Sequence, residues 1–217
     1  MCKCVIFSGM PVSTTMRLYV PADAFVIAAD AGWRQAEALG VRPHLVVGDF
    51  DSSAPPQAAQ VIRLPQDKNE TDTYYAAREA VARGYRDITI LGGMGGRFDH
   101  TVANLQTLAY LAESGANNLM ADENTELRCI APGSISIAGR PDCYLSVFSA
   151  AGIARGVTVA GVKFPLQNAV LTSDFPLGVS NEFLPGASAH ISLAGGLLLV
   201  MLVRKEHYGT APGGLSV

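Results

Sequence analysis

The sequence predicts an α/β N-terminal domain, with a mostly parallel, Rossmann-like sheet and flanking helices, followed by an all-β C-terminal sandwich. In the first half, short apolar runs alternate with segments of helical spacing, which is the pattern of a parallel sheet covered by helices. From about Thr125 the helical spacing stops, and short β-rich runs follow between turns that contain glycine and proline. We place the boundary near Asp122 to Thr125 and expect domains of residues 1–123 and 124–217.

Each element of the first half has its own signal. The helix expected over 72–83 carries apolar residues at helical spacing and stops before Gly84, and the helix expected over 99–112 stops in the same way before Gly115. A shorter helix over 33–39 closes at Gly40. The expected strands of this half are 4–7, 25–29, 44–47, 88–91 and 118–120.

The second half is predicted to contain strands only. Regularly spaced short strands with turn signals are typical of an antiparallel sandwich or barrel. The polar run at 178–183 favours a hairpin loop on its residues alone. The expected strands are 127–130, 134–137, 145–148, 157–162, 189–193 and 197–203.

Composition excludes several functional classes. The 217 residues are 49 % hydrophobic and carry a net charge of −3, so a large core is expected. The chain has no Lys/Arg-rich tract, so we expect no nucleic-acid partner. The apolar run 197–203 is too short to span a bilayer, so we expect no membrane association. Scattered cysteines and no apparent secretory signal lead us to expect a cytoplasmic protein with reduced thiols.

Carboxylates gather where the strands of the first half end. In an open α/β sheet, ligands bind outside the carboxyl ends of the strands, so we expect these residues on one rim. Two carboxylates about 5 Å apart repel by roughly 3 kcal/mol at an effective dielectric near 20, and a divalent cation removes that repulsion. The sequence therefore predicts a site for Mg²⁺ and a polyphosphate. The residues concerned are Asp30, Asp49, Asp51, Asp72 and Asp99.

Each motif alone also has a structural interpretation. Asp49 and Asp51 follow Gly48, and such residues favour turns. Thr71 is a natural N-cap and Asp72 suits a helix dipole, although Lys68 nearby could bind phosphate as a point charge.

The glycine-rich segment 92–97 lies between a strand and a helix, where backbone N–H groups can hold phosphate. It is not a Walker A loop, and a tight turn explains it equally well. Asp99 could cap the following helix, and His100 and Asn104 could form a polar surface edge.

Taken together and in order, these motifs resemble those of the bacterial thiamine pyrophosphokinase family. The resemblance covers nearly the whole chain. One departure is Asn69, where the family commonly carries Asp. The matching stretches are Ala29-Asp30-Ala31-Gly32, Gly48-Asp49-Phe50-Asp51-Ser52, Lys68-Asn69-Glu70-Thr71-Asp72, Gly95-Gly96-Arg97-Phe98-Asp99-His100 with Asn104, Gly161-Val162-Lys163-Phe164-Pro165-Leu166 and Ser180-Asn181-Glu182-Phe183.

The resemblance implies transfer of a pyrophosphoryl group from ATP to the hydroxyl of thiamine, giving thiamine diphosphate and AMP. It also implies a homodimer whose thiamine pocket lies between the α/β domain of one subunit and the sandwich of the other. Phe183 and Trp33 are candidates for stacking on thiamine. The other expected site residues fall into three groups. Asp49, Asp51 and Asp72 are assigned to Mg²⁺; Asp30, Lys68, Thr71, Gly95, Gly96, Arg97 and His100 to ATP; Asp99, Asn104, Ser180 and Asn181 to thiamine, with Asp99 also orienting or deprotonating its hydroxyl.

Two other functions remain open from the sequence. A related diphosphokinase acting on a hydroxymethyl-pterin could share the acidic N-terminal half, although the matching motifs of the second half argue against it. A nucleotide- or thiamine-binding sensor without turnover would not need the full carboxylate set. A substrate panel and a test for AMP release would separate these functions.

Overall fold

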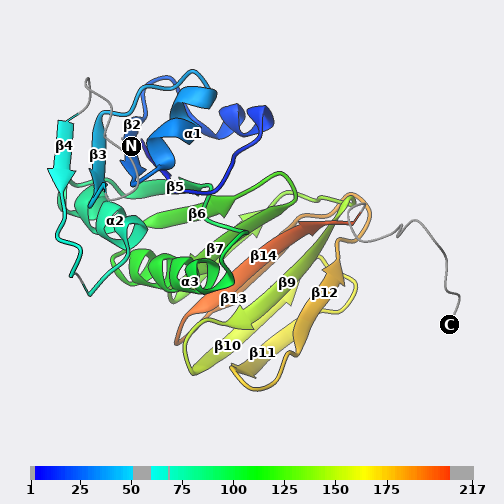
Figure 1. Ribbon diagram of the computed structural model, residues 1–217. Helices are drawn as coiled ribbons and strands as arrows, with labels where there is room; N and C mark the ends of the chain where they lie inside the picture. Colours follow the sequence, from blue (N-terminus) through cyan, green and yellow to red (C-terminus); the bar gives the residue numbers. More distant parts are fainter. Residues whose placement is uncertain (1–2, 51–59, 68, 206–217) are drawn as a thin grey trace, which may run out of the picture. The chain divides into compact units, whose positions relative to one another are not determined.

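The computed structural model describes residues 3–50, 60–67 and 69–205. The chain divides into two compact units, Met1–Glu123 and Asn124–Val217 (Figure 1). The two units differ in secondary structure. Among the described residues, the helices η1, α1, α2 and α3 all belong to unit 1. None of the described helices is long and apolar enough to cross a membrane.

Unit 1 is built on parallel strands in the order β6-β5-β1-β2-β3-β4. All five strand pairs along this order are parallel. Because β2 and β5 lie on opposite sides of β1, the winding direction of the sheet reverses between β1 and β5. The strands are β1 (Lys3–Phe7), β2 (Phe25–Ala29), β3 (Leu45–Gly48), β4 (Gln60–Arg63), β5 (Asp87–Leu91) and β6 (Asn117–Ala121).

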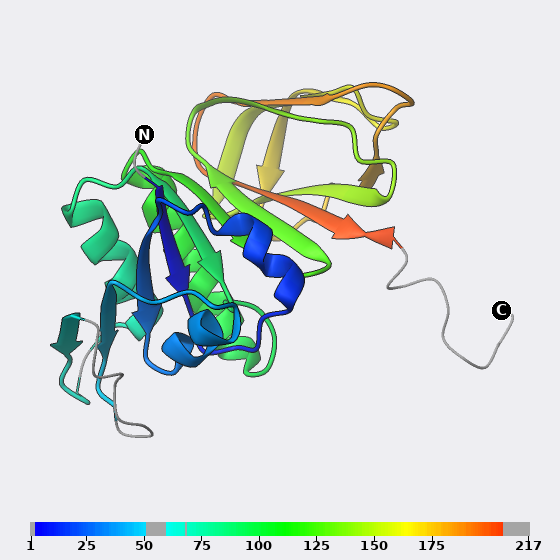
Figure 2. The same cartoon turned by 90° about the horizontal axis from the view of Figure 1, so that it is seen from above.

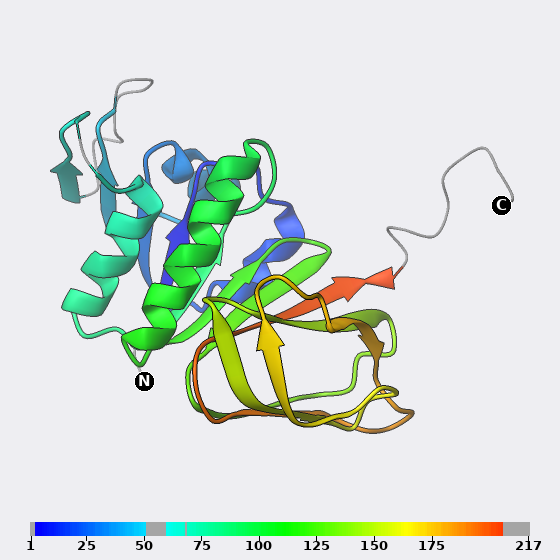
Figure 3. The ribbon, with the colours of Figure 1, turned by 90° about the horizontal axis from the view of Figure 1, so that it is seen from below.

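Helices cover both faces of these strands. Figures 2 and 3, which view the chain from opposite sides, show α2 (Asp72–Ala82) and α3 (Phe98–Glu113) on one face. The short helix α1 (Gly32–Ala38) and the 3-10 helix η1 (Thr14–Tyr19) lie on the other face. Burial on both faces explains why the central strands are uninterrupted apolar runs. In β2, for example, every residue from Val26 to Ala29 is buried.

Unit 2 contains two groups of four antiparallel strands. Their orders are β12-β9-β14-β7 and β11-β10-β13-β8. This is the β-strand half of the two-domain layout that the sequence predicts. The strands are β7 (Thr125–Ile130), β8 (Gly133–Ile137), β9 (Cys143–Ser149), β10 (Ile153–Ala160), β11 (Leu166–Thr172), β12 (Gly178–Glu182), β13 (Ala189–Leu193) and β14 (Leu198–Arg204).

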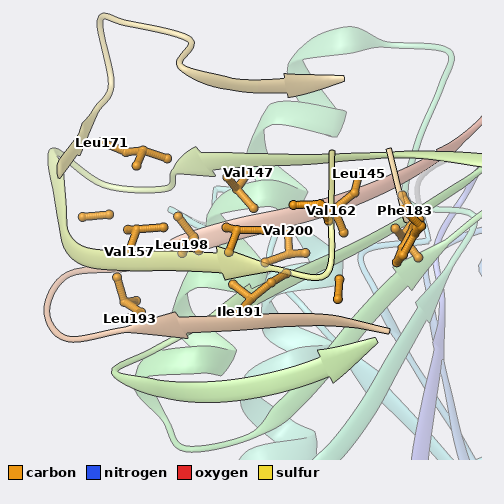
Figure 4. Close-up of a cluster of buried hydrophobic side chains, with 14 residues drawn as sticks. Leu145, Val147, Val157, Val162, Leu171, Phe183, Ile191, Leu193, Leu198 and Val200 are labelled. Carbon is orange, nitrogen blue, oxygen red and sulfur yellow. The ribbon is translucent and has the colours of Figure 1, made fainter. Parts of the chain in front are cut away.

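The core of unit 2 lies between its two sheets. Figure 4 shows Val157 and Leu193 from one sheet beside Val147 and Val200 from the other. Each is at most 4 % exposed. Since burying a side chain of this size contributes about 1.5–3 kcal/mol, this layer is the main source of stability for the sandwich.

Three strands and one helix were not predicted. The sequence gives no long apolar run at β4, an edge strand whose residues are mostly exposed. The short helix η1 is held by its Ser13 cap, and β11 alternates too weakly to stand out.

The expectation of a hairpin loop at 178–183 is wrong, because β12 pairs with β9 through this segment. An edge strand tolerates polar residues on its open side, and a register shift between Gly178 and Asn181 obscures its alternation.

Candidate active site

The carboxyl ends of β1, β2, β3 and β5 lie at one edge of unit 1. The reversal between β1 and β5 is the point at which open α/β sheets bind ligands. Ser8 follows β1, Asp30 follows β2, Asp49 follows β3 and Gly92 follows β5. The topology therefore brings the acidic and glycine-rich motifs to one edge of the sheet.

Asp30 lies directly against Gly48, the last residue of β3. Its backbone N–H donates to the carbonyl of Val47 at 2.7 Å, and its φ of 46° is in the left-handed region. A Cβ added to Gly48 would lie 3.1 Å from Asp30 Cα, so glycine permits this close approach. Asp30 and Asp49 thus occupy the ends of neighbouring strands, while Asp51 lies outside the described residues.

The start of α2 fixes Asp72. The Thr71 side chain accepts a hydrogen bond from the N–H of Tyr74 at 3.2 Å, as expected for an N-cap. The next residue along, Thr73, shares a buried 2.8 Å hydroxyl–hydroxyl hydrogen bond with Ser8. This bond ties the first turn of α2 to the end of β1. Lys68 lies outside the described residues.

The glycine-rich segment is closely packed at its start. Gly92 has a φ of 68°, and a Cβ there would lie 2.5 Å from the carbonyl oxygen of Met10. Asn104 is buried and donates to the carbonyl of Gly93 at 2.7 Å, so the alternative of a polar surface edge does not hold for this residue. Burial of this amide is accompanied by a hydrogen bond, as buried polar groups require.

The later glycines of this segment are exposed. The N–H of Gly95 donates to the hydroxyl of Thr101 at 3.2 Å, while Gly96 has a φ of 59°. A phosphate held by the Gly95 N–H would have to replace that hydroxyl. The geometry is that of a turn whose backbone N–H groups lie at the start of a helix.

Arg97 and Asp99 form a two-bond ion pair at the start of α3. Arg97 Nη2 lies 2.6 Å from Asp99 Oδ2, and Arg97 Nε lies 3.2 Å from Asp99 Oδ1. These bonds, with a weaker effect from the His100 N–H, hold the pKa of the Asp99 carboxyl below its ordinary value. The N-cap of α3 is Arg97, so Asp99 lies in the first turn rather than at the cap. His100 is exposed.

In unit 2, the adjacent residues Ser180 and Asn181 differ in their exposure to solvent. Ser180 is exposed with a φ of 57°. Asn181 is 8 % exposed, and its amide makes bonds of 3.0 and 2.6 Å to the N–H and carbonyl of Phe164. Asn181 Oδ1 also accepts from the N–H of Glu182 at 2.9 Å. With its oxygen accepting two bonds, Asn181 has one N–H left for a ligand.

The two aromatic candidates for stacking on thiamine have different surroundings. Phe183 is 9 % exposed and packs in the core of unit 2, and Trp33 stacks with the guanidinium of Arg34 at 5.3 Å. Phe164 is 59 % exposed, beside a cavity of about 200 Å³. Phe164 belongs to the matched stretch Gly161-Val162-Lys163-Phe164-Pro165-Leu166, and no site role was predicted for it from the sequence.

The carboxylate edge offers oxygen donors of the kind that bind Mg²⁺. Asp30 Oδ1 is buried and has no hydrogen-bond partner among the described residues. Within those residues no three His, Cys, Asp or Glu side chains form a group that could hold a metal. Mg²⁺ in phosphate-transfer sites uses one or two protein carboxylates, with water and substrate phosphates completing its shell. One or two of the carboxylates Asp30, Asp49 and Asp72 would therefore suffice, and their oxygens are the donors that Mg²⁺ prefers.

These features define a class: a two-domain protein with a Rossmann-like unit, an acidic and glycine-rich carboxyl edge, and a β-sandwich. Residues 16–120 match the family model for the thiamin pyrophosphokinase catalytic domain. Residues 134–198 match the model for the thiamin pyrophosphokinase vitamin B1 binding domain. One model matches most of unit 1 and the other a large part of unit 2, and the chain belongs to the thiamin pyrophosphokinase family.

Individual relatives agree with this assignment. The chain is 27 % identical to the thiamine pyrophosphokinase of Bacillus subtilis over 191 residues, covering 84 % of this chain and 89 % of the relative. The crystal structure of thiamine pyrophosphokinase from Bacillus subtilis has the same fold, with a TM-score of 0.84, 24 % identity and coverage of 94 % and 99 % of the two chains. That from Geobacillus thermodenitrificans gives a TM-score of 0.81, 26 % identity and coverage of 94 % and 98 %.

Proposed function

We propose that this enzyme transfers the pyrophosphoryl group of ATP to the hydroxyl of thiamine, giving thiamine diphosphate and AMP, with Mg²⁺ as cofactor. The observation that carries the proposal is the match of two models of one family to the two units in order. The acidic edge of unit 1 supports it, because phosphoryl-type transfer depends mostly on positioning and on neutralising charge.

The carboxylates are assigned to the metal. Asp49, Asp51 and Asp72 would hold Mg²⁺ directly or through water, with Asp30 in support. When bound, the ion would neutralise negative charge on the phosphate oxygens. The buried oxygen of Asp30 supports a role that needs a cation nearby, since an unpaired buried carboxylate oxygen is costly.

The start of α3 is assigned to ATP and to the acceptor hydroxyl. Arg97 and the N–H groups of Gly95 and Gly96 would bind phosphates, together with Lys68, Thr71 and His100. Asp99 would orient or deprotonate the thiamine hydroxyl. The depressed pKa of Asp99 keeps its carboxylate ionised, which supports the orienting role because an ionised carboxylate accepts a hydrogen bond from the hydroxyl.

Unit 2 is assigned to thiamine and to a second subunit. Ser180 would bind the substrate directly, Asn181 would act partly by holding Phe164, and Asn104 would support the pocket from α3.

The apolar side chains of Phe164, Phe175 and Leu177 are 46–64 % exposed, which fits contact with a second copy of the chain. We propose a homodimer with shared sites. The buried thiols of Cys4, Cys129 and Cys143 are consistent with our assignment to the cytoplasm.

The decisive experiment incubates the protein with ATP, thiamine and Mg²⁺ and identifies the products by mass. We expect thiamine diphosphate and AMP. Excess chelator should abolish turnover and added Mg²⁺ should restore it, because the acidic edge would otherwise repel ATP. Full activity in excess chelator would contradict the metal assignment.

The same assay separates the alternatives. A hydroxymethyl-pterin offered in place of thiamine tests the related diphosphokinase activity. Tight binding of ATP and thiamine without AMP release would indicate a sensor instead of an enzyme.

A further inference from the structure

An ion pair outside the proposed catalytic set connects the chain before α2 to the body of that helix. Arg78 Nη1 lies 2.9 Å from Oε1 and also 2.9 Å from Oε2 of Glu70. Glu70 precedes the N-cap Thr71, whereas Arg78 lies about two turns inside the helix. The guanidinium therefore draws the preceding segment back along the side of α2.

A second connection holds the same turn from the sheet side. The Ser8–Thr73 hydrogen bond is buried, while the side chains of Glu70 and Arg78 are 24 % and 53 % exposed. Asp72 lies in sequence between Glu70 and Thr73. One buried bond and one exposed ion pair therefore restrain the chain on either side of Asp72 in the sequence.

The pair also forms part of the wall of a groove on unit 1. The groove has a volume of about 610 Å³. It is lined by Asn69, Glu70, Thr71, Tyr74, Arg78 and Gln106, from the start of α2 and from α3. The ion pair and the N-cap Thr71 thus line this groove, and Asp72 is the next residue along the chain.

We propose that Glu70 and Arg78 are positioning residues, which hold the entry to α2 so that Asp72 is placed for the reaction. This inference rests on the proposed function, and specifically on the role of Asp72. A partly exposed ion pair contributes little to stability, so its effect should appear in the geometry of the site. A displacement of about 1 Å can reduce a rate up to about a hundredfold, which makes the kinetics a sensitive readout.

The test compares two ion pairs on the same helix. Arg78→Met breaks the pair with Glu70, and Arg83→Met breaks a matched pair with Glu79, whose Nε–Oε1 distance is 2.8 Å. We expect Arg78→Met to lower kcat about tenfold with KM for thiamine changed less than about twofold, and Arg83→Met to change neither by more than about twofold. Both variants should keep a similar Tm.

Two further measurements make the result specific. The first is direct binding of Mn²⁺ to the folded protein with a non-hydrolysable ATP analogue, read by electron paramagnetic resonance. It should weaken in Arg78→Met and not in Arg83→Met. The second is the charge exchange of Glu70→Arg with Arg78→Glu, which should recover most of the activity. If Arg78→Met does not fold, Arg78→Lys keeps the charge but loses the forked geometry and serves in its place.

The outcomes are distinct. Equal effects of Arg78→Met and Arg83→Met on kcat and on Mn²⁺ binding would overturn the positioning role, as would wild-type kinetics in Arg78→Met. An inactive wild-type protein would instead contradict the proposed function, while the Mn²⁺ measurement would still report on the pair.

Discussion

At the scale of single residues, the ion pair of Arg97 and Asp99 predicts a pH effect. The wild-type pKa of Asp99 is depressed chiefly by hydrogen bonds from Arg97, so the carboxylate stays ionised to lower pH than usual. In Arg97→Gln that pKa should rise toward its ordinary value, and activity that needs the ionised form should be lost at higher pH as the solution is acidified. The acid limb of kcat/KM for thiamine, measured at saturating ATP, should therefore move to higher pH.

A control separates this effect from loss of phosphate binding. Arg97→Lys keeps a positive charge beside Asp99 and should show a smaller shift of the acid limb. An unmoved limb in Arg97→Gln would mean that the carboxyl of Asp99 does not titrate in the step that limits kcat/KM.

Two adjacent residues of β12 should behave differently on truncation. Asn181→Ala removes three hydrogen bonds and leaves the partly buried N–H and carbonyl of Phe164 without this partner. It should lower the free energy of unfolding by about 1–3 kcal/mol and weaken thiamine binding, with ATP affinity nearly unchanged. Ser180→Ala should weaken thiamine binding with little effect on stability, because Ser180 is exposed. Denaturant unfolding and calorimetric titration measure both.

Two results would contradict these roles of Ser180 and Asn181. Unchanged stability in Asn181→Ala would mean that water replaces the amide, and a change in ATP affinity alone would remove both residues from the thiamine site.

At the scale of elements, most of unit 1 could be predicted from apolar periodicity. The strand 25–29 is found as expected, and the helices expected at 72–83 and 99–112 are α2 and α3 to within a residue or two. Their signals are local, since helical spacing and a following glycine belong to one segment of chain. Edge strand β4 and bulged β12 were missed because pairing with neighbours, rather than their own sequence, makes them strands.

The packing of α1 on β1 depends on a glycine. A Cβ on Gly32 would overlap the backbone carbonyl of Phe7, which cannot move aside as a side chain can. We expect Gly32→Ala to lower the free energy of unfolding by about 1–3 kcal/mol, as in other overpacked sites. Gly9→Ala is the matched control, since no atom lies within 4 Å of its added Cβ. Equal stability of the two variants in urea would contradict this packing argument.

At the scale of the whole molecule, the site could be predicted in outline and not in detail. Asp30, Asp49 and Asp72 were placed at the carboxyl edge by the order of strands and helices alone. The bond from Asn104 to Gly93 and the bonds from Asn181 to Phe164 join residues 11 and 17 apart. Such pairs depend on how the chain folds back on itself, and no pattern within either segment indicates them.

The proposed homodimer leads to a prediction for mixtures of variants. If each site combines unit 1 of one subunit with unit 2 of the other, Asp72→Asn and Asn181→Ala chains should complement each other. A mixed dimer would contain one site with two intact halves and one site with both lesions, so activity should recover to as much as about a quarter of wild type in an equal, fully exchanged mixture, since half of the dimers are mixed. Exchange is first demonstrated by co-purification of differently tagged chains, and each variant alone serves as the baseline. Mixed dimers that form without any gain in activity would show that each site is built within one subunit.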